Sequence, residues 1–297
     1  MKTKIITPAL SIFKADGALD VDTTVKTYKR LADGGVDGIL MFGSCGEFFG
    51  VTLEEKKALL KAAQEAVGDR VELMAGTGGM SFRETIELTK YAASIGIKKV
   101  LVVSTYYFPA NEEDLVSYYG AVADCSDADM YFYDIPECVG YDITPSIVLK
   151  VHEGRKNVMG YKDTISSVAH TCDLINTVCD KYPDFEVFNG YETQLPVNVA
   201  AGGAGVIGGM SNLVPEFFAK WVKAFNDNDF EKIAEGEKYI SYISKIYSIN
   251  TPFMPTLKRA LKIMGVIEED RCAAPFSKIY EAKTKELVSI METANIL

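Results

Sequence analysis

The stretch KVLVVS at residues 99–104 indicates the fold class. Its centre is continuously apolar, whereas a strand with one face in water would alternate apolar and polar residues. Such a run is typical of a strand buried on both faces of a parallel sheet. Seven further short apolar runs occur, most of them also continuously apolar, at residues 5–10 (IITPAL), 38–43 (GILMFG), 71–76 (VELMAG), 130–135 (MYFYDI), 157–162 (NVMGYK), 185–190 (FEVFNG) and 204–209 (AGVIGG). The sequence therefore predicts eight buried strands.

Helical patterns separate these runs. In residues 20–35 apolar side chains recur at helical spacing, and residues 52–69 open with Thr52 and Glu55 in capping-box spacing. Residues 82–96 form another helical segment that ends in a glycine. Eight strands alternating with helices, at about 30 residues a unit, predict a (β/α)8 TIM barrel of the α/β class.

A doubly wound open sheet is the alternative fold. GAGVIG at residues 203–208 matches the GxGxxG pattern of nucleotide-binding proteins. That pattern belongs to the turn between a first strand and its helix. Here Val206 and Ile207 belong to the predicted strand itself. The stretch is therefore better explained by glycines packed closely in a barrel than by the nucleotide site of an oxidoreductase.

The pattern changes near the C-terminus, where only helices are predicted from about residue 228. No linker rich in proline, glycine or serine marks an independent module. We expect residues 1–225 to form the barrel and residues 226–297 a C-terminal helical extension packed on it, as a single structural unit.

Composition excludes several classes of function. The 297 residues carry a formal charge of −10 with scattered basic residues, which argues against nucleic acid and anionic membranes as partners. Six cysteines without a CxxC pair, and only two histidines, leave little material for a metal site. We find no signal peptide and no apolar run long enough to span a membrane, so we expect a cytoplasmic protein.

Polar residues at the ends of the predicted strands define a candidate site, because active sites of such barrels lie at the carboxyl ends of the strands. Ser44 and Cys45 follow the second strand, and Tyr107 follows the fourth. Tyr133 and Lys162 are 29 residues apart, about one strand–helix unit, so they should lie on adjacent strands at similar depth.

Lys162 has two interpretations. Most lysines at strand ends are solvated charges. A buried, neutral amine can instead attack a carbonyl and form an imine that accepts electrons when a neighbouring carbon–carbon bond breaks. A nearby phenol can relay the proton, and backbone N–H groups of the turn after Ser44 can hold a carboxylate. The paired Tyr133 favours the second interpretation.

Three motifs resemble one family. GSCGEFFGVTLEEK (43–56) is similar to the GTTGE or GSTGE motif of the dihydrodipicolinate synthase/N-acetylneuraminate lyase family of class I pyruvate aldolases. YDIPECVGYDIT (133–144) resembles its Y-N-x-P-x-x-x-G segment, and GYKDTISS (160–167) its lysine motif. The resemblance covers about residues 4–265, in the expected order and spacing.

The resemblance implies roles for individual residues. Lys162 would be the Schiff-base lysine, Tyr133 the proton-relay phenol and Ser44 the hydroxyl that links the relay. The amides of Ser44 and Cys45 would hold the pyruvate carboxylate, and Tyr107 would reach a neighbouring subunit's site. The family is usually a homotetramer built as a dimer of dimers, and the imine needs no metal or diffusible cofactor.

Three departures from the family pattern are visible. Cys45 replaces a threonine, and we expect it to be a small filler that leaves an anion site made of backbone amides intact. Asp134 replaces an asparagine beside the tyrosine, and the sequence assigns it no role. Cys138 stands where dihydrodipicolinate synthases have an arginine for the second substrate's carboxylate, and a thiol cannot replace a bidentate guanidinium.

The predicted substrate is therefore a hydroxylated keto acid. Thr164 matches the K-x-T pattern of the aldolase branch, and GYKDTISSVAH with GSCGEF most resembles bacterial 2-keto-3-deoxygluconate-type aldolases. Gly190, Glu192 and Ser211 are further candidate substrate contacts, although Glu192 equally suits a helix N-terminus.

We expect a carbon–carbon lyase that converts a 2-keto-3-deoxy sugar acid to pyruvate and a short aldehyde, or the reverse. The alternatives are N-acetylneuraminate lyase, 4-hydroxy-tetrahydrodipicolinate synthase, which Cys138 disfavours, and a non-catalytic binding barrel. Partners would be small keto acids and aldehydes.

Overall fold

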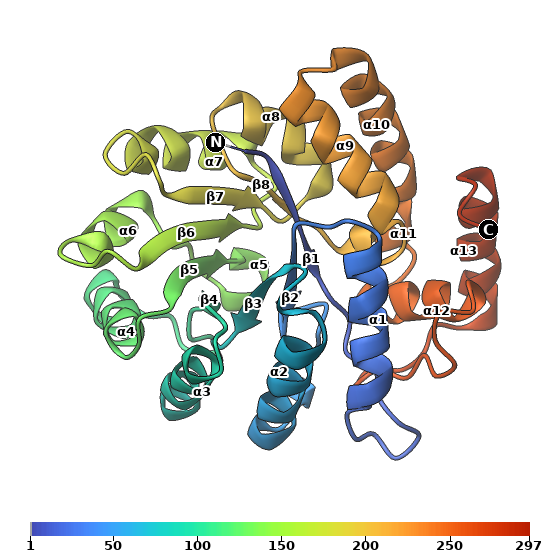
Figure 1. The fold of residues 1–297 in the computed structure, drawn as a ribbon, viewed down its shortest axis with the longest axis horizontal. Helices are drawn as coiled ribbons and strands as arrows, with labels where there is room; N and C mark the ends of the chain where they lie inside the picture. The colour runs from blue at the N-terminus through green and yellow to red at the C-terminus, as the bar shows by residue number, and fades with distance from the viewer. Residues whose placement is uncertain (1) are drawn as a thin grey trace. The chain divides into compact units, whose positions relative to one another are not determined.

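The predicted strands form one closed barrel of eight parallel strands in the order β1 to β8. The structure is a computed structural model that describes residues 2–297. The predicted TIM barrel is confirmed, with helices between the strands (Figure 1). The strands are β1 (Lys4–Pro8), β2 (Gly38–Met41), β3 (Glu72–Gly76), β4 (Lys99–Val103), β5 (Asp129–Asp134), β6 (Val158–Asp163), β7 (Glu186–Asn189) and β8 (Gly205–Ile207).

Helices follow the strands as expected. The main helices are α1 (Val21–Asp33), α2 (Leu53–Val67), α3 (Phe82–Ser94), α4 (Glu112–Asp124), α5 (Pro136–Val139), α6 (Pro145–His152), α7 (Val168–Leu174), α8 (Leu195–Ala200), α9 (Pro215–Asp227), α10 (Phe230–Ile243), α11 (Lys245–Ser248), α12 (Met254–Ile263) and α13 (Glu281–Thr293). Short 3-10 helices are η1 (Phe48–Gly50), η3 (Glu192–Gln194) and η4 (Gly209–Asn212), and η2 (Ile175–Cys179) is a short π-helix.

The helix-start signals act as their sequences predict. Asp20 caps α1 by accepting a hydrogen bond from the Thr23 amide. Thr52 and Glu55 form the capping box of α2, in which each side chain accepts from the other residue's backbone N–H. These contacts satisfy amides that the first helical turn would otherwise leave unpaired.

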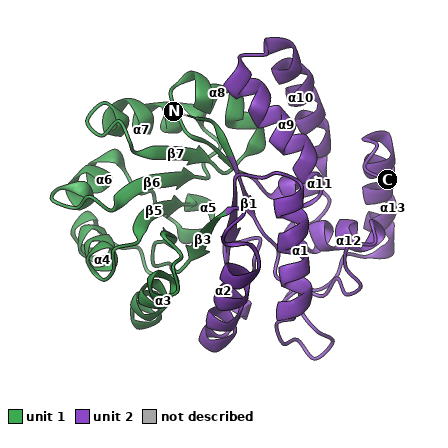
Figure 2. Ribbon diagram, in the orientation of Figure 1, with its two compact units in different colours: residues 1–4, 72–207 green, residues 5–71, 208–297 purple. Residues whose placement is uncertain are grey.

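The chain divides into two compact units (Figure 2). Unit 1 comprises residues 1–4 and 72–207, and unit 2 comprises residues 5–71 and 208–297. Helices α10 to α13 belong to unit 2 and occupy the stretch for which only helices were predicted. The boundary near residue 225 stays a prediction.

Two glycines allow close approaches between strands. A Cβ on Gly160 of β6 would lie 2.3 Å from the ring of Tyr131 in β5, so this glycine makes room for a buried aromatic. A Cβ on Gly205 would lie 2.0 Å from the carbonyl oxygen of Lys4. The GAGVIG stretch thus contains a barrel strand, and the next long helix, α9, begins only at Pro215.

Candidate active site

Tyr133 and Lys162 are direct neighbours in the ladder between β5 and β6. Both side chains are buried, each at 4% exposure, and the Lys162 amine lies 4.1 Å from the centre of the Tyr133 ring. The predicted adjacency is confirmed. The register of two parallel strands produces it, because residues one unit apart end at the same height.

The Lys162 side chain is buried in the barrel. Within residues 2–297 no carboxylate forms an ion pair with it, whereas buried Lys258 pairs with Glu47 and Lys99 pairs with Glu72 and Glu186. Side chains alternate along a strand, so Tyr161 and Asp163 point to the opposite face from Lys162. The Lys162 side chain is therefore shielded from water, whereas most lysines at strand ends are solvated.

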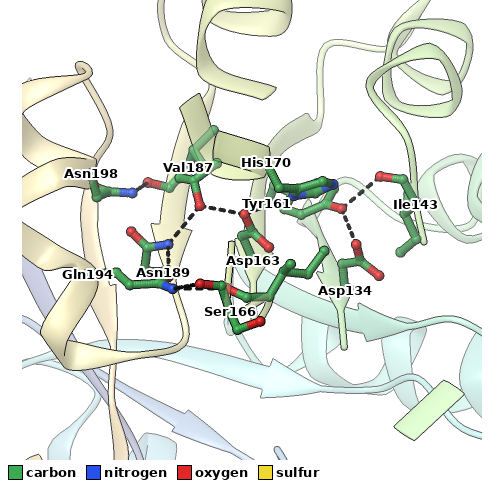
Figure 3. A network of polar contacts seen from close by, with 12 residues as sticks. Asp134, Ile143, Tyr161, Asp163, Ser166, His170, Val187, Asn189, Gln194 and Asn198 are labelled. Carbon is green, nitrogen blue, oxygen red and sulfur yellow. Dashed lines mark hydrogen bonds and ion pairs between the residues drawn. The ribbon is translucent and has the colours of Figure 1, made fainter. Parts of the chain in front are cut away.

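Asp134 belongs to unit 1 and, because side chains alternate along a strand, lies on the opposite face of β5 from Tyr133, here called the outer face. Figure 3 shows it beside Tyr161. Its carboxylate accepts a hydrogen bond from the Tyr161 hydroxyl at 2.7 Å, and that hydroxyl also lies 2.7 Å from the Ile143 carbonyl oxygen. Burial raises the pKa of Asp134 to about 6. The sequence offered no sign of this role, because Tyr161 and Ile143 are far apart in the chain.

Asp163 anchors the segment after Lys162 from the same outer face. Its carboxylate accepts from the Thr171 hydroxyl at 2.6 Å, and His170 Nδ1 lies 3.1 Å from it (Figure 3). The hydrogen bond to Asp163 raises the pKa of His170. Helix α7 is thereby attached to the strand that carries Lys162.

Two predicted substrate contacts, Thr164 and Gly190, meet in unit 1. A Cβ on Gly190 would lie 2.2 Å from the Thr164 hydroxyl oxygen, so the threonine side chain rests directly on the glycine. Glu192 begins η3 and is buried at 2% exposure. It is therefore not an exposed acid at a helix start.

The remaining predicted positions of unit 1 are at the surface. Tyr107 has φ = 81° and is 82% exposed, and its ring contacts the exposed Phe108 edge-to-face at 4.9 Å between centroids. Cys138 lies in α5 and is exposed, and burial of part of the thiol raises its pKa. The role of each stays a prediction.

Unit 2 contains the turn of Ser44, Cys45 and Gly46. Gly46 packs tightly, since a Cβ there would lie 2.9 Å from the Phe42 backbone nitrogen, and its carbonyl oxygen accepts from Ser11 at 2.7 Å. Cys45 is buried. Because there is no room for a side chain at this position, the turn requires a glycine.

Glu47 closes this turn and was not anticipated. Its φ of 50° is left-handed, and its carboxylate forms a fully buried ion pair with Lys258 of α12. The carboxylate also accepts from the Ala273 amide at 2.7 Å, and Lys258 donates to the Arg271 carbonyl at 2.9 Å. No spacing rule could relate residues this far apart.

Ser211 lies in η4 of unit 2 and is buried. Its hydroxyl lies 2.8 Å from Thr7 Oγ1 and 2.6 Å from the Gly208 carbonyl oxygen. These contacts give Ser211 a structural function, and its predicted substrate contact stays a prediction.

The model of the dihydrodipicolinate synthetase family matches residues 1–294. The chain belongs to this family. YagE of Escherichia coli (strain K12), provisionally named a 2-dehydro-3-deoxy-D-gluconate aldolase, is 35% identical over 98% of this chain and 96% of its own. YjhH of the same strain, provisionally named a 2-dehydro-3-deoxy-D-pentonate aldolase, is 31% identical over the same shares.

The chain is also similar to a synthase of the same family and to a solved structure. A 4-hydroxy-tetrahydrodipicolinate synthase of Hydrogenobaculum is 28% identical over the whole length of both chains. The crystal structure of YagE in complex with pyruvate superposes with a TM-score of 0.96, at 34% identity over 99% of each chain. As a member of this family, the present chain is a carbon–carbon lyase. Within residues 2–297 no helix is both long and apolar enough to cross a membrane.

Proposed function

We propose that the chain is a class I aldolase that cleaves or forms a 2-keto-3-deoxy sugar acid through an imine at Lys162. The observation that carries the proposal is the buried amine of Lys162, without a counter-ion among residues 2–297 and in register with Tyr133. Two relatives at 35% and 31% identity are named as aldolases of such acids, and one of them was solved with pyruvate.

The proposed reaction begins when the Lys162 amine attacks the keto carbon and water leaves, which forms an iminium. The substrate's C3–C4 bond then breaks, its electron pair moves into the iminium to form an enamine, and the C4 hydroxyl loses its proton through Tyr133. The aldehyde departs. Protonation of the enamine at C3 and hydrolysis of the imine release pyruvate and restore the amine.

The other roles follow from the motifs. Ser44 would link Tyr133 to the proton path, and the Ser44 and Cys45 amides would hold the carboxylate as a turn of backbone N–H groups does for anions. Thr164, Gly190, Glu192 and Ser211 would line the part of the site for the remaining substrate. The proposal includes a homotetramer in which Tyr107 enters a neighbour's site.

Borohydride reduction in the presence of pyruvate tests the imine. We expect a stable adduct on Lys162 by peptide mass mapping, and none in Lys162→Ala. Lys99 and Lys258 are internal controls, because both are largely buried but engaged in ion pairs. An adduct on another lysine, or no adduct at all, contradicts the proposal.

A substrate panel tests the class of sugar acid. Pyruvate release from 2-keto-3-deoxygluconate should exceed release from N-acetylneuraminate. Condensation of pyruvate with aspartate semialdehyde should be poor, because Cys138 offers no charge for a second carboxylate. A preference for N-acetylneuraminate or for aspartate semialdehyde would replace the proposed substrate while leaving the imine chemistry in place.

A further inference from the structure

The loop of residues 164–167 connects β6 to α7 and carries Thr164. The Thr164 amide donates to the Asp134 carbonyl oxygen at 2.9 Å, which continues the strand contact by one residue. The Thr164 hydroxyl oxygen is buried, and no group within residues 2–297 forms a hydrogen bond with it. Leaving a buried hydroxyl unpaired costs about 1–3 kcal/mol, so a hydroxyl in this state is a candidate for pairing with a ligand.

Gly190 supports one side of Thr164. A Cβ on this residue would lie 2.2 Å from the hydroxyl oxygen, 2.8 Å from the Thr164 Cβ and 2.9 Å from its Cγ2. The Gly190 amide donates to the Asp163 carbonyl oxygen at 2.6 Å, so the glycine is itself held against β6. The direction of the Thr164 hydroxyl therefore depends on where the loop backbone lies.

Gln194 holds that backbone from the end of η3. Its Nε2 donates to the carbonyl oxygens of Ile165 and Ser166, each at 3.0 Å (Figure 3). The side chain is buried at 8% exposure. One amide thus fixes two consecutive carbonyls of the loop.

Asn189 sets the orientation of the Gln194 amide. Its Nδ2 donates to Gln194 Oε1 and to the Thr171 hydroxyl oxygen, both at 2.9 Å. Thr171 in turn donates to Asp163 at 2.6 Å. Gln194 therefore has its oxygen toward a donor and its nitrogen toward two acceptors. The side chains of Asp163, Thr171, Asn189 and Gln194 all belong to unit 1.

We propose that Gln194 is a positioning residue that fixes the loop of residues 164–167, so that the Thr164 hydroxyl pairs with a hydroxyl of the sugar-acid substrate beyond its pyruvate part. The inference rests on the proposed function. Lys162 is held separately, by its pairing with Tyr133 and Phe188 in the neighbouring strands. Loss of Gln194 should therefore impair use of the sugar acid and spare the imine with pyruvate.

The test compares Gln194→Met, which keeps the length but removes the amide, with Thr164→Val and the double variant. The readouts are kcat/KM for cleavage of 2-keto-3-deoxygluconate and borohydride trapping with pyruvate. We expect each single variant to lose about tenfold or more in kcat/KM, the range of one hydrogen bond to substrate, with trapping unchanged. The double variant should resemble Thr164→Val alone, because Gln194 acts through Thr164.

Asn198→Ala is the matched control. Asn198 is another buried amide of unit 1, and among residues 2–297 its side chain forms hydrogen bonds with the Val187 carbonyl and the Gly205 amide rather than with the loop. The Asn198→Ala variant should have a lower melting temperature and a kcat/KM within about twofold of the wild-type value. If Gln194→Met does not fold, Gln194→Asn withdraws the same nitrogen with a smaller change.

Three results would overturn the proposal: kcat/KM within twofold of wild type in the folded Gln194 variant, additive losses in the double variant, or equal loss of pyruvate trapping. Failure of the wild-type protein to be trapped by pyruvate would instead contradict the proposed imine chemistry. The two failures are therefore distinguishable.

Discussion

Lys162 and Tyr133 face each other across the β5–β6 ladder, with the amine 4.1 Å from the centre of the phenol ring. The contact lies inside the barrel wall, where both side chains are almost completely buried. If Lys162 forms the proposed imine, a phenol this close to it is well placed to move a proton between the substrate's C4 hydroxyl and its surroundings.

Tyr133→Phe should retain the pyruvate imine and lose catalysis. Removing a proton-transfer group costs about 10²–10⁴ in rate, so we expect kcat to fall in that range while borohydride trapping continues. Tyr131→Phe is the matched control, since Tyr131 lies two residues earlier in β5 and its hydroxyl donates to Glu186 instead. Steady-state kinetics of both variants measure the difference. Equal loss of activity in Tyr133→Phe and Tyr131→Phe would refute the proton-transfer role of Tyr133.

Asp134 should make stability depend on pH. Its pKa is raised from 3.8 to about 6 by burial, so the folded protein binds more protons than the unfolded chain between these values. This contribution to stability is fully present below about pH 3.8 and is lost as pH rises through about 6.

Asp134→Asn removes that dependence. Between pH 4 and pH 7 the wild-type protein should lose about 2 kcal/mol more free energy of unfolding than the variant, which is most of the full contribution at 1.36 kcal/mol per pKa unit. The asparagine carbonyl can still accept from Tyr161, so the local contact is kept. Urea unfolding at both pH values measures the difference, and parallel pH profiles would disprove the buried titration.

The Glu47–Lys258 ion pair should be essential to the turn after β2. Lys258→Met leaves a buried carboxylate uncompensated, which costs about 3–5 kcal/mol of folding free energy. The double variant Glu47→Gln/Lys258→Met should be more stable than Lys258→Met, because no unpaired charge remains. Denaturant unfolding of the single and double variants gives the coupling, and purely additive losses would argue against a paired charge.

Tyr107 should act in the site of another subunit. Its ring is 82% exposed in a left-handed loop position, a strained conformation for a tyrosine. We expect Tyr107→Ala and Lys162→Ala each to be inactive alone and to regain about a quarter of wild-type activity when mixed and allowed to exchange subunits. Half of randomly formed pairs are then mixed, and each has one complete site.

Exchange followed by size-exclusion chromatography and assay measures this complementation. A control mixture of Lys162→Ala with Lys162→Arg should stay inactive, because no subunit in it has the amine. Activity that does not return in the first mixture, despite proven subunit exchange, would place Tyr107 outside the neighbouring site.

Much of the fold could be predicted because its causes are local. Each strand is buried on both faces, so its apolar run is visible without knowledge of its neighbours, as KVLVVS illustrates. The capping box of Thr52 and Glu55 likewise needs only four residues. The 29-residue interval between Tyr133 and Lys162 predicted their adjacency because parallel strands repeat at a constant length.

The tertiary structure decided what depends on contacts between distant segments. Asp134 received its partner from β6, and Glu47 received Lys258 from α12, although neither pair has a recognisable spacing. The Ser211 hydroxyl likewise contacts Thr7 from the first strand, which residue order does not indicate, and its predicted substrate contact stays a prediction.

The sequence by itself determined the barrel and the pairing of Lys162 with Tyr133, because periodicity and motif order record local burial and strand register. Only the tertiary structure decided which side chains fix the loop that follows Lys162. The amide of Gln194 reaches the loop carbonyls of Ile165 and Ser166 across almost thirty residues of chain, in an orientation that Asn189 sets. Such directed hydrogen bonds depend on where folded segments meet, and residue order alone does not record that.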